Sequence, residues 1–230
     1  MGERKFPELE LPDLEADFKP RASLGDKISS FSRASFGVIK LILGIALLPF
    51  VYSVTVAFLN DFILVDRAAQ SYFWRGIITL LVIYLFVWEP AIIYSKGHKI
   101  LELIFNFFKP LVRVAPYLLP IYTIVLFILY SLLSLVIKSE WLIKYSIFLF
   151  GFTLCLHLVF SAKSIRGKKS DFLKSNYIFG FSLVYIINIA LLAFFLNLIF
   201  KEFSFVNFSN NSISSAKNIF YAVFKQLFVR

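Results

Sequence analysis

The chain has 230 residues, of which 59% are apolar, 19% are aromatic and 17% are charged, and its formal net charge is +10. Soluble domains are typically about 45–50% apolar and about 25% charged. This composition and a mean hydropathy of +0.79 therefore exclude an ordinary soluble domain, a disordered chain and a collagen-like fibre. The single cysteine excludes a disulfide framework and a cysteine-based zinc ribbon.

The first 35 residues differ from the rest of the chain because they are polar and charged. They contain seven acidic residues and three prolines, and a segment of this kind buries too little apolar surface to fold alone. No short apolar run followed by a cleavage site indicates a secretory signal peptide. We expect residues 1–35 to form a loose or surface-lying segment on the cytoplasmic side.

Five apolar runs follow, each close to the length of about 20 residues that a membrane-spanning helix needs. They cover residues 41–60, 76–95, 114–137, 145–162 and 175–200. The runs are too long for barrel strands and lack strict alternation. Backbone groups in lipid must be paired within their own segment. The sequence therefore predicts an all-α integral membrane protein, with a bundle of five transmembrane helices in residues 36–200.

Lysine and arginine residues alternate between rich and poor segments along the chain. Seven precede the first run, four lie in 96–113 and five in 163–174, whereas 61–75 and 138–144 hold two each. Basic loops of membrane proteins face the cytoplasm. The pattern predicts a cytoplasmic N-terminus and an external C-terminus, in a bacterial inner membrane.

The positive charge has two possible explanations. Contact of the inner loops with the anionic lipid bilayer explains it directly. Nucleic-acid binding is disfavoured, because no compact basic domain is present to carry it.

The external tail, residues 201–230, shows helical periodicity. Lys217, Asn218, Lys225 and Gln226 take the face opposite its apolar residues. We predict an amphipathic helix with Asn211 or Ser212 as its N-cap. It either lies flat on the outer membrane surface or packs on the outer ends of the protein's own helices. Its apolar positions recur mostly three or four residues apart and are Ile213, Ala216, Ile219, Phe220, Val223, Phe224, Leu227 and Phe228.

Polar residues within the apolar runs raise functional hypotheses, because ionisable groups at membrane depth are rare. Glu89 is either an interfacial carboxylate beside a kink at Pro90 or a buried carboxylate that gates a pathway. Asn188 and Asn197 are able to form hydrogen bonds between helices of the bundle.

Both histidines of the chain and two carboxylates are predicted to lie on the inner side at similar depth. His98 and Glu102 are four residues apart and share one face if their segment is helical. His157 is near the inner end of the fourth run, and Asp171 follows in the next loop. Two histidines and carboxylates form an acceptable zinc ligand set. The alternative is a solvated His98 and a hydrogen-bonded, buried His157.

Three stretches of the chain carry a family resemblance: Trp88–Phe105, Ala115–Tyr122 and Gly151–Ser161, the last followed by Asp171 and Asn188. Over residues 73–192, about half of the chain, the sequence resembles the site-2-protease-like membrane zinc metallopeptidases. That resemblance implies a membrane-embedded helical bundle. In those proteins a His-Glu-x-x-His motif on a membrane helix supplies two zinc ligands and a general base.

The departures from that motif argue against the family's chemistry. Aligned at its first histidine, this chain reads His98-Lys99-Ile100-Leu101-Glu102. Lys99 stands where the carboxylate base belongs, and as a cation it repels a metal. Glu102 replaces the second histidine. The resemblance therefore implies a divergent, catalytically inactive member that lacks the motif, with zinc as a possible but unexpected cofactor.

Three functions follow from these observations. The first is an inactive membrane protein that acts as a scaffold, binder or regulator of other membrane proteins. The second is a transporter or membrane-assembly component, for which the helix-breaking Pro116 and Pro120 also provide an argument. The third is a metalloenzyme with a rearranged site, which metal analysis separates from the other two.

Overall fold

The computed structural model describes residues 24–107, 109–166 and 176–228. The chain divides into two compact units, Met1–Phe36 and Gly37–Arg230. Within the first unit the described residues, 24–36, are helical. The expected loose segment therefore lies largely outside the described residues, because it covers positions 1–35.

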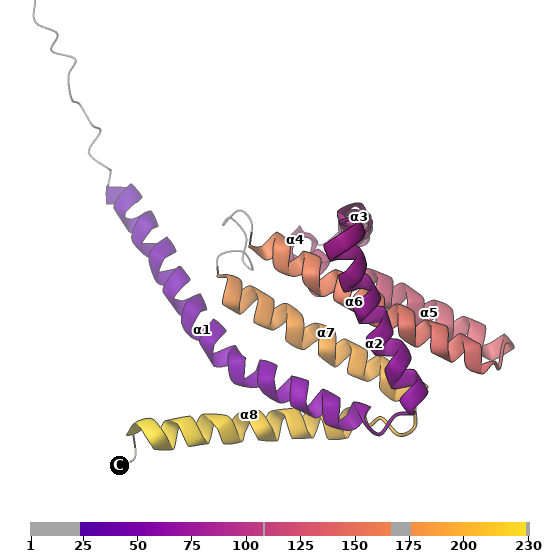
Figure 1. Ribbon diagram of the computed structural model, residues 1–230. Coiled ribbons are helices and arrows are strands. Elements are labelled where there is room, and N and C mark those ends of the chain that lie inside the picture. Colours follow the sequence, from indigo (N-terminus) through magenta and orange to yellow (C-terminus); the bar gives the residue numbers. More distant parts are fainter. Residues whose placement is uncertain (1–23, 108, 167–175, 229–230) are drawn as a thin grey trace, which may run out of the picture. The chain divides into compact units, whose positions relative to one another are not determined.

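All regular secondary structure in the described ranges is helical (Figure 1). The predicted all-α class is confirmed for these residues. The elements are α1 (Leu24–Phe62), α2 (Arg67–Val82), the π-helical turn η1 (Ile83–Val87), α3 (Ala91–Ile104), α4 (Lys109–Leu118), α5 (Ile121–Val136), α6 (Glu140–Ile165), α7 (Tyr177–Ile199) and α8 (Phe205–Phe228).

Four helical stretches are long and apolar enough to cross a membrane. They are Gly37–Phe62, Arg67–Val87, Glu140–Ile165 and Tyr177–Ile199. The fifth apolar helix, α5, has only 16 residues. Sixteen residues rise about 24 Å, which is less than a hydrocarbon core of about 30 Å. The membrane class of the prediction is thus supported, whereas the count of five spans stays a prediction.

Proline breaks the helix within two of the five predicted apolar runs. In the run 76–95 the helical backbone stops at Val87, and α3 starts after Pro90. In the run 114–137 α4 stops at Leu118, and α5 starts after Pro120. The breaks at Pro90 and Pro120 agree with the interruptions expected there, because proline has no N–H to continue the ladder and restricts the residue before it, whereas Pro116 lies inside α4.

The second membrane-length helix also begins earlier than predicted, at Arg67. The carboxylate of Asp66 caps it by accepting hydrogen bonds from the backbone N–H groups of Ala68 and Ala69, at 3.0 and 3.2 Å. An aspartate at this position satisfies two of the donors that a helix start leaves unpaired. This local cap extends the helix over a stretch that hydropathy alone assigned to a loop.

Helices α2 and α6 pack backbone to backbone through two glycines. A Cβ atom added to Gly76 would lie 2.0 Å from the carbonyl oxygen of Phe148, and one added to Gly151 would lie 2.2 Å from that of Phe73. No side chain fits at either position without separating the helices. Small residues allow such close approach between helices in membranes.

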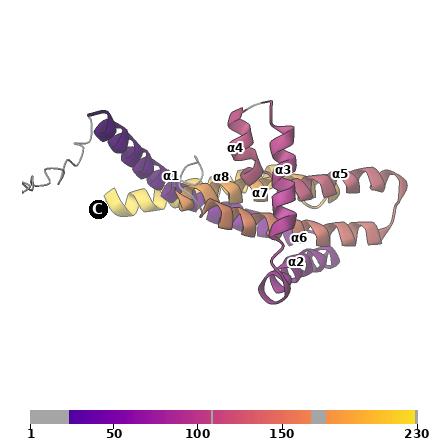
Figure 2. The same ribbon diagram turned by 90° about the horizontal axis from the view of Figure 1, so that it is seen from above.

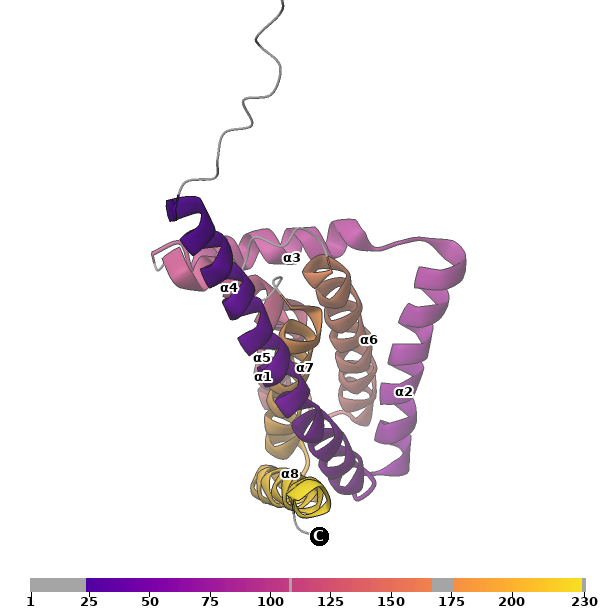
Figure 3. The same ribbon diagram turned by 90° about the vertical axis from the view of Figure 1, so that its left-hand side faces the viewer.

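Helix α6 is the centre of the bundle. It runs parallel to α2, since Leu80 packs with Leu156 and Tyr84 with Phe160 farther along both helices. Figure 3 shows α6 between α2 and α7. Helix α5 lies antiparallel to α6, and Figure 2 shows α3 and α4 as a pair beside them. A buried hydrogen bond of 2.9 Å joins Thr123 of α5 to Thr153 of α6.

The core at the α1–α2 end is built from phenylalanine. Four buried rings, of Phe58, Phe62, Phe73 and Phe203, lie with centroids between 5.1 and 6.4 Å apart. Aromatic pairs at this spacing contribute beyond the area they bury. This cluster joins the ends of α1 and α2 to the connection between α7 and α8.

Helix α8 packs along the second half of α1 and runs antiparallel to it (Figure 1). Its buried side is Phe208, Ser212 and Ala216. The Phe220 ring lies 5.8 Å from the Phe50 ring of α1. Most of the apolar positions predicted from the periodicity, from Ile213 to Phe228, are exposed. Their contact with a membrane surface stays a prediction.

The predicted N-cap of α8 is wrong. The helix begins at Phe205, and Ser204 Oγ accepts a hydrogen bond from the backbone N–H of Asn207 at 3.2 Å. Asn197 of α7 accepts another from the backbone N–H of Phe205 at 2.9 Å. Ser212 lies inside the helix and donates to the Phe208 carbonyl. The polar Ser/Asn stretch is therefore helical, because caps upstream of it start the helix.

Candidate functional site

The break between α4 and α5 releases backbone carbonyls inside the bundle. Pro120 has no N–H for the carbonyl of Pro116, and the N–H of Ile121 turns back to the carbonyl of Leu119. The carbonyls of Tyr117 and Leu118 then need partners from elsewhere. An unpaired backbone group in an apolar membrane interior costs several kcal/mol. The break therefore demands polar side chains on neighbouring helices.

Two side chains of α6 pair with the carbonyl of Tyr117. His157 Nε2 lies 2.9 Å from that oxygen, and Ser161 Oγ donates to it at 3.3 Å. Both are buried, with 6% of His157 and none of Ser161 exposed. A carbonyl oxygen only accepts, so the hydrogen of His157 is on Nε2. His157 thus closes the break as a hydrogen-bond donor.

Asn188 of α7 pairs with the next carbonyl, that of Leu118. Its side-chain nitrogen donates to this oxygen at 2.9 Å and to the carbonyl of Val184 at 2.8 Å. Asn188 is fully buried, and its Oδ1 has no partner within the described part of the chain. We call His157, Ser161 and Asn188 the carbonyl-capping cluster.

Aromatic side chains of α3 and α4 cover this cluster. The Tyr94 hydroxyl lies 3.2 Å from Ser161 Oγ, and the His98 ring packs edge-on against the Tyr117 ring with centroids 4.8 Å apart. His98 and His157 line the same small cavity, whose free volume is about 10 Å³. A single water needs about 10–15 Å³. The cavity is therefore too small for a substrate.

The predicted zinc ligands are only partly brought together. His98 Nε2 lies 3.7 Å from Glu102 Oε1 on one face of α3, as their spacing indicated. Glu102 does not line the cavity that contains His157, and Asp171 lies outside the described residues. No group of three His, Cys, Asp or Glu residues able to hold a metal occurs within the described ranges. A zinc site at this place stays the alternative hypothesis that it was in the sequence.

Glu89 pairs with a cation. Its carboxylate forms a salt bridge with the ammonium group of Lys163 on α6, and both side chains are partly exposed. It lies directly before Pro90, at the turn between η1 and α3. This position agrees with the interfacial interpretation of Glu89 rather than with a buried gate.

Sequence reasoning missed Tyr117 and Ser161. Their signal was indirect: Ser161 follows His157 by four residues, on one helix face, and Pro120 marks a break whose carbonyls need donors. The acceptors are backbone atoms, so no motif of side chains records them. Residue spacing alone therefore does not reveal which carbonyl His157 contacts.

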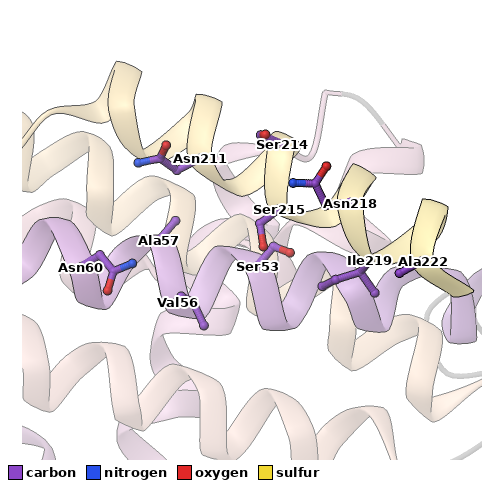
Figure 4. A pocket seen from close by; sticks show the side chains of 10 residues that line it. All are labelled: Ser53, Val56, Ala57, Asn60, Asn211, Ser214, Ser215, Asn218, Ile219 and Ala222. Atoms are coloured by element: carbon purple, nitrogen blue, oxygen red, sulfur yellow. The ribbon is translucent and has the colours of Figure 1, made fainter.

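A second, larger hollow lies between α1 and α8 and was not predicted. It is an open groove of about 510 Å³, within the range of small-molecule sites. Figure 4 shows polar side chains from both helices on its walls. We call it the α1–α8 groove; its polar lining residues are Ser53, Asn60, Asn211, Ser214, Ser215 and Asn218.

Comparisons with protein-family models, with curated proteins and with solved structures found no match for this chain. They therefore do not test the resemblance to site-2-protease-like metallopeptidases, which stays a prediction. The function has to be argued from the chain's own residues.

Proposed function

We propose that this chain is an integral membrane protein that acts by binding, as a scaffold, binder or regulator, and that it catalyses no hydrolysis. One observation carries the proposal. His157, the histidine at membrane depth, is bonded through Nε2 to the Tyr117 carbonyl. The open carbonyl at the helix break therefore accounts for a buried histidine at this position without a metal.

The surroundings of His98 support the same conclusion. Peptide hydrolysis by a metal centre needs a carboxylate that takes a proton from the attacking water. Lys99 occupies the motif position of that base and is exposed on α3. Glu102, the remaining carboxylate of this helix face, lies beside His98 and is 48% exposed. It therefore has no dry pocket in which to act on a substrate.

A zinc and cleavage experiment tests the proposal. Detergent-purified protein is loaded with zinc and desalted, and its metal content and its cleavage of a transmembrane model substrate are measured with and without chelator. We expect metal content no higher than in the His98→Ala and His157→Ala variants, and no chelator-sensitive cleavage. Stoichiometric zinc together with cleavage that disappears in His98→Ala would establish a rearranged metalloenzyme instead.

We also propose that five helices cross the membrane, with the N-terminus cytoplasmic and the connection between α7 and α8 external. Helices α2 and α6 run in the same direction, so the chain has to return across the membrane between them. Helix α5, which lies between them in sequence and runs antiparallel to α6, supplies that crossing despite its 16 residues. Reporter fusions at Gly167 and Glu202 should report opposite sides. The same side for both would remove α7 as a crossing, and a reporter after Arg230 tests whether α8 stays external.

A further inference from the structure

The α1–α8 groove is uncharged along its whole length. All the described residues that line it are serine, asparagine or small aliphatic side chains. The nearest charged residues in sequence, Asp61 and Lys217, are not among them. Serine and asparagine each donate and accept hydrogen bonds. The walls therefore suit a neutral ligand with hydroxyl or carbonyl groups.

One wall residue lacks a partner. Ser53 is fully buried, and its Oγ has no hydrogen-bond partner within the described part of the chain. Figure 4 shows its side chain in the space between α1 and α8, facing Ser215. A buried hydroxyl without a hydrogen bond has lost its contact with water and gained nothing in return. A ligand group that bonds to Ser53 would remove this cost.

The groove also changes in polarity along its length. Asn60 and Asn211 stand at the end next to the start of α8, and Ile219 and Ala222 at the other. Beyond them, the Phe50 and Phe220 rings lie with centroids 5.8 Å apart. Its wall on α1 belongs to a stretch apolar enough to span a membrane. A molecule that fills the groove therefore meets polar groups along most of its length and an apolar end beyond Ile219 and Ala222.

We propose that the α1–α8 groove binds a membrane lipid with a neutral, hydroxyl-bearing headgroup, of the glycosyl diacylglycerol class. The headgroup lies among the asparagines and Ser53, and the glycerol esters and first methylenes lie toward Ile219 and Ala222. An anionic headgroup is disfavoured, because burying a charge without a counter-charge is costly. The proposal rests on the binding function proposed above and names its ligand class.

Lipid titration of purified protein tests this assignment. The thermal midpoint in a neutral detergent is followed with added monoglucosyl diacylglycerol, phosphatidylglycerol or free glucose. Asn211→Leu removes a polar side chain that lines the groove. Asn210→Leu makes the same change at the preceding residue, which does not line the groove, and is the matched control. Both positions are exposed, so neither variant should impair folding.

We expect the glycolipid to raise the midpoint and the other two compounds not to. Asn211→Leu should weaken the apparent affinity roughly two- to tenfold, since a hydrogen bond contributes about 0.5–1.5 kcal/mol, and Asn210→Leu should not. An equal response to phosphatidylglycerol, a response to free glucose alone, or equal loss in both variants would overturn the proposal. So would a photocrosslinker at position 211 that captures a protein helix in place of lipid.

The two proposals fail separately. Chelator-sensitive cleavage would end the non-catalytic function and leave glycolipid binding at the groove intact. Loss of glycolipid selectivity with no cleavage would leave a non-catalytic membrane protein whose ligand lies elsewhere.

Discussion

The carbonyl-capping cluster and the α1–α8 groove are both made of uncharged polar side chains among apolar helices, but they differ in how their hydrogen bonds are satisfied. In the cluster, side-chain donors meet the Tyr117 and Leu118 carbonyls, and almost no space is left. In the groove, Ser53 is buried without a partner beside about 510 Å³ of open volume. The first arrangement stabilises the fold, and the second is available to a ligand.

Two of the candidate residues named from the sequence, His157 and Asn188, belong to the first region. A histidine and an asparagine at membrane depth suggest function, yet here they repair a break that proline makes. The serines and asparagines of α8 drew attention only as a helix cap. An unpaired polar atom alone does not separate the two regions, since Asn188 Oδ1 is also unpaired; only the groove has open volume beside its unpaired group.

The largest effect should come from removing both donors to the Tyr117 carbonyl. His157→Leu combined with Ser161→Ala leaves that carbonyl unpaired, and the expected loss is about 1–3 kcal/mol of the free energy of unfolding. Each single variant should lose less than half of this, because the other donor remains. Detergent-to-SDS unfolding followed by circular dichroism measures all three. Additive losses would contradict a shared acceptor.

A smaller loss is expected for Asn188→Leu. The variant leaves the Leu118 carbonyl without its donor but also removes the unpaired Oδ1 of Asn188. Interhelical hydrogen bonds in membranes contribute about 0.6 kcal/mol on average and up to about 1.7, so the loss should stay within that range. The same unfolding titration measures it, and Asn197→Leu, which removes the α7 side chain that caps the start of α8, compares a hydrogen bond outside the cluster. A loss above 3 kcal/mol would mean that Asn188 has further partners.

The smallest effect, of opposite sign, is expected at Ser53. In detergent without lipid, Ser53→Ala removes a buried hydroxyl that has no partner, so stability should be unchanged or rise by up to about 1 kcal/mol. With the glycolipid present, the variant should gain less stability than the wild type. Thermal midpoints with and without lipid measure both differences. A clear loss in the lipid-free protein would show that Ser53 bonds within the fold, and the two regions would then not differ.

The sequence alone determined the helical class and the approximate place of most helices. Apolar runs long enough to cross a bilayer leave the backbone no alternative to internal pairing. Helix α6 contains the predicted run 145–162, and α7 occupies residues 177–199 of the predicted run 175–200. The spacing of His98 and Glu102 correctly predicted that they share a helix face. These features depend on residues near one another in the chain, so periodicity and length suffice to find them.

Tertiary structure decided everything that depends on a partner far along the chain. Lys163 pairs with Glu89 across 74 residues, and Asn188 reaches the Leu118 carbonyl across 70. Gly76 and Gly151 allow close backbone packing only because α2 and α6 meet at those two positions. The groove exists because α8 turns back along α1. The side chains of Asn197 and Ser204 cap the start of α8 and so fix where the chain turns. Backbone acceptors and helix contacts leave no pattern in residue types, so only the packed bundle reveals them.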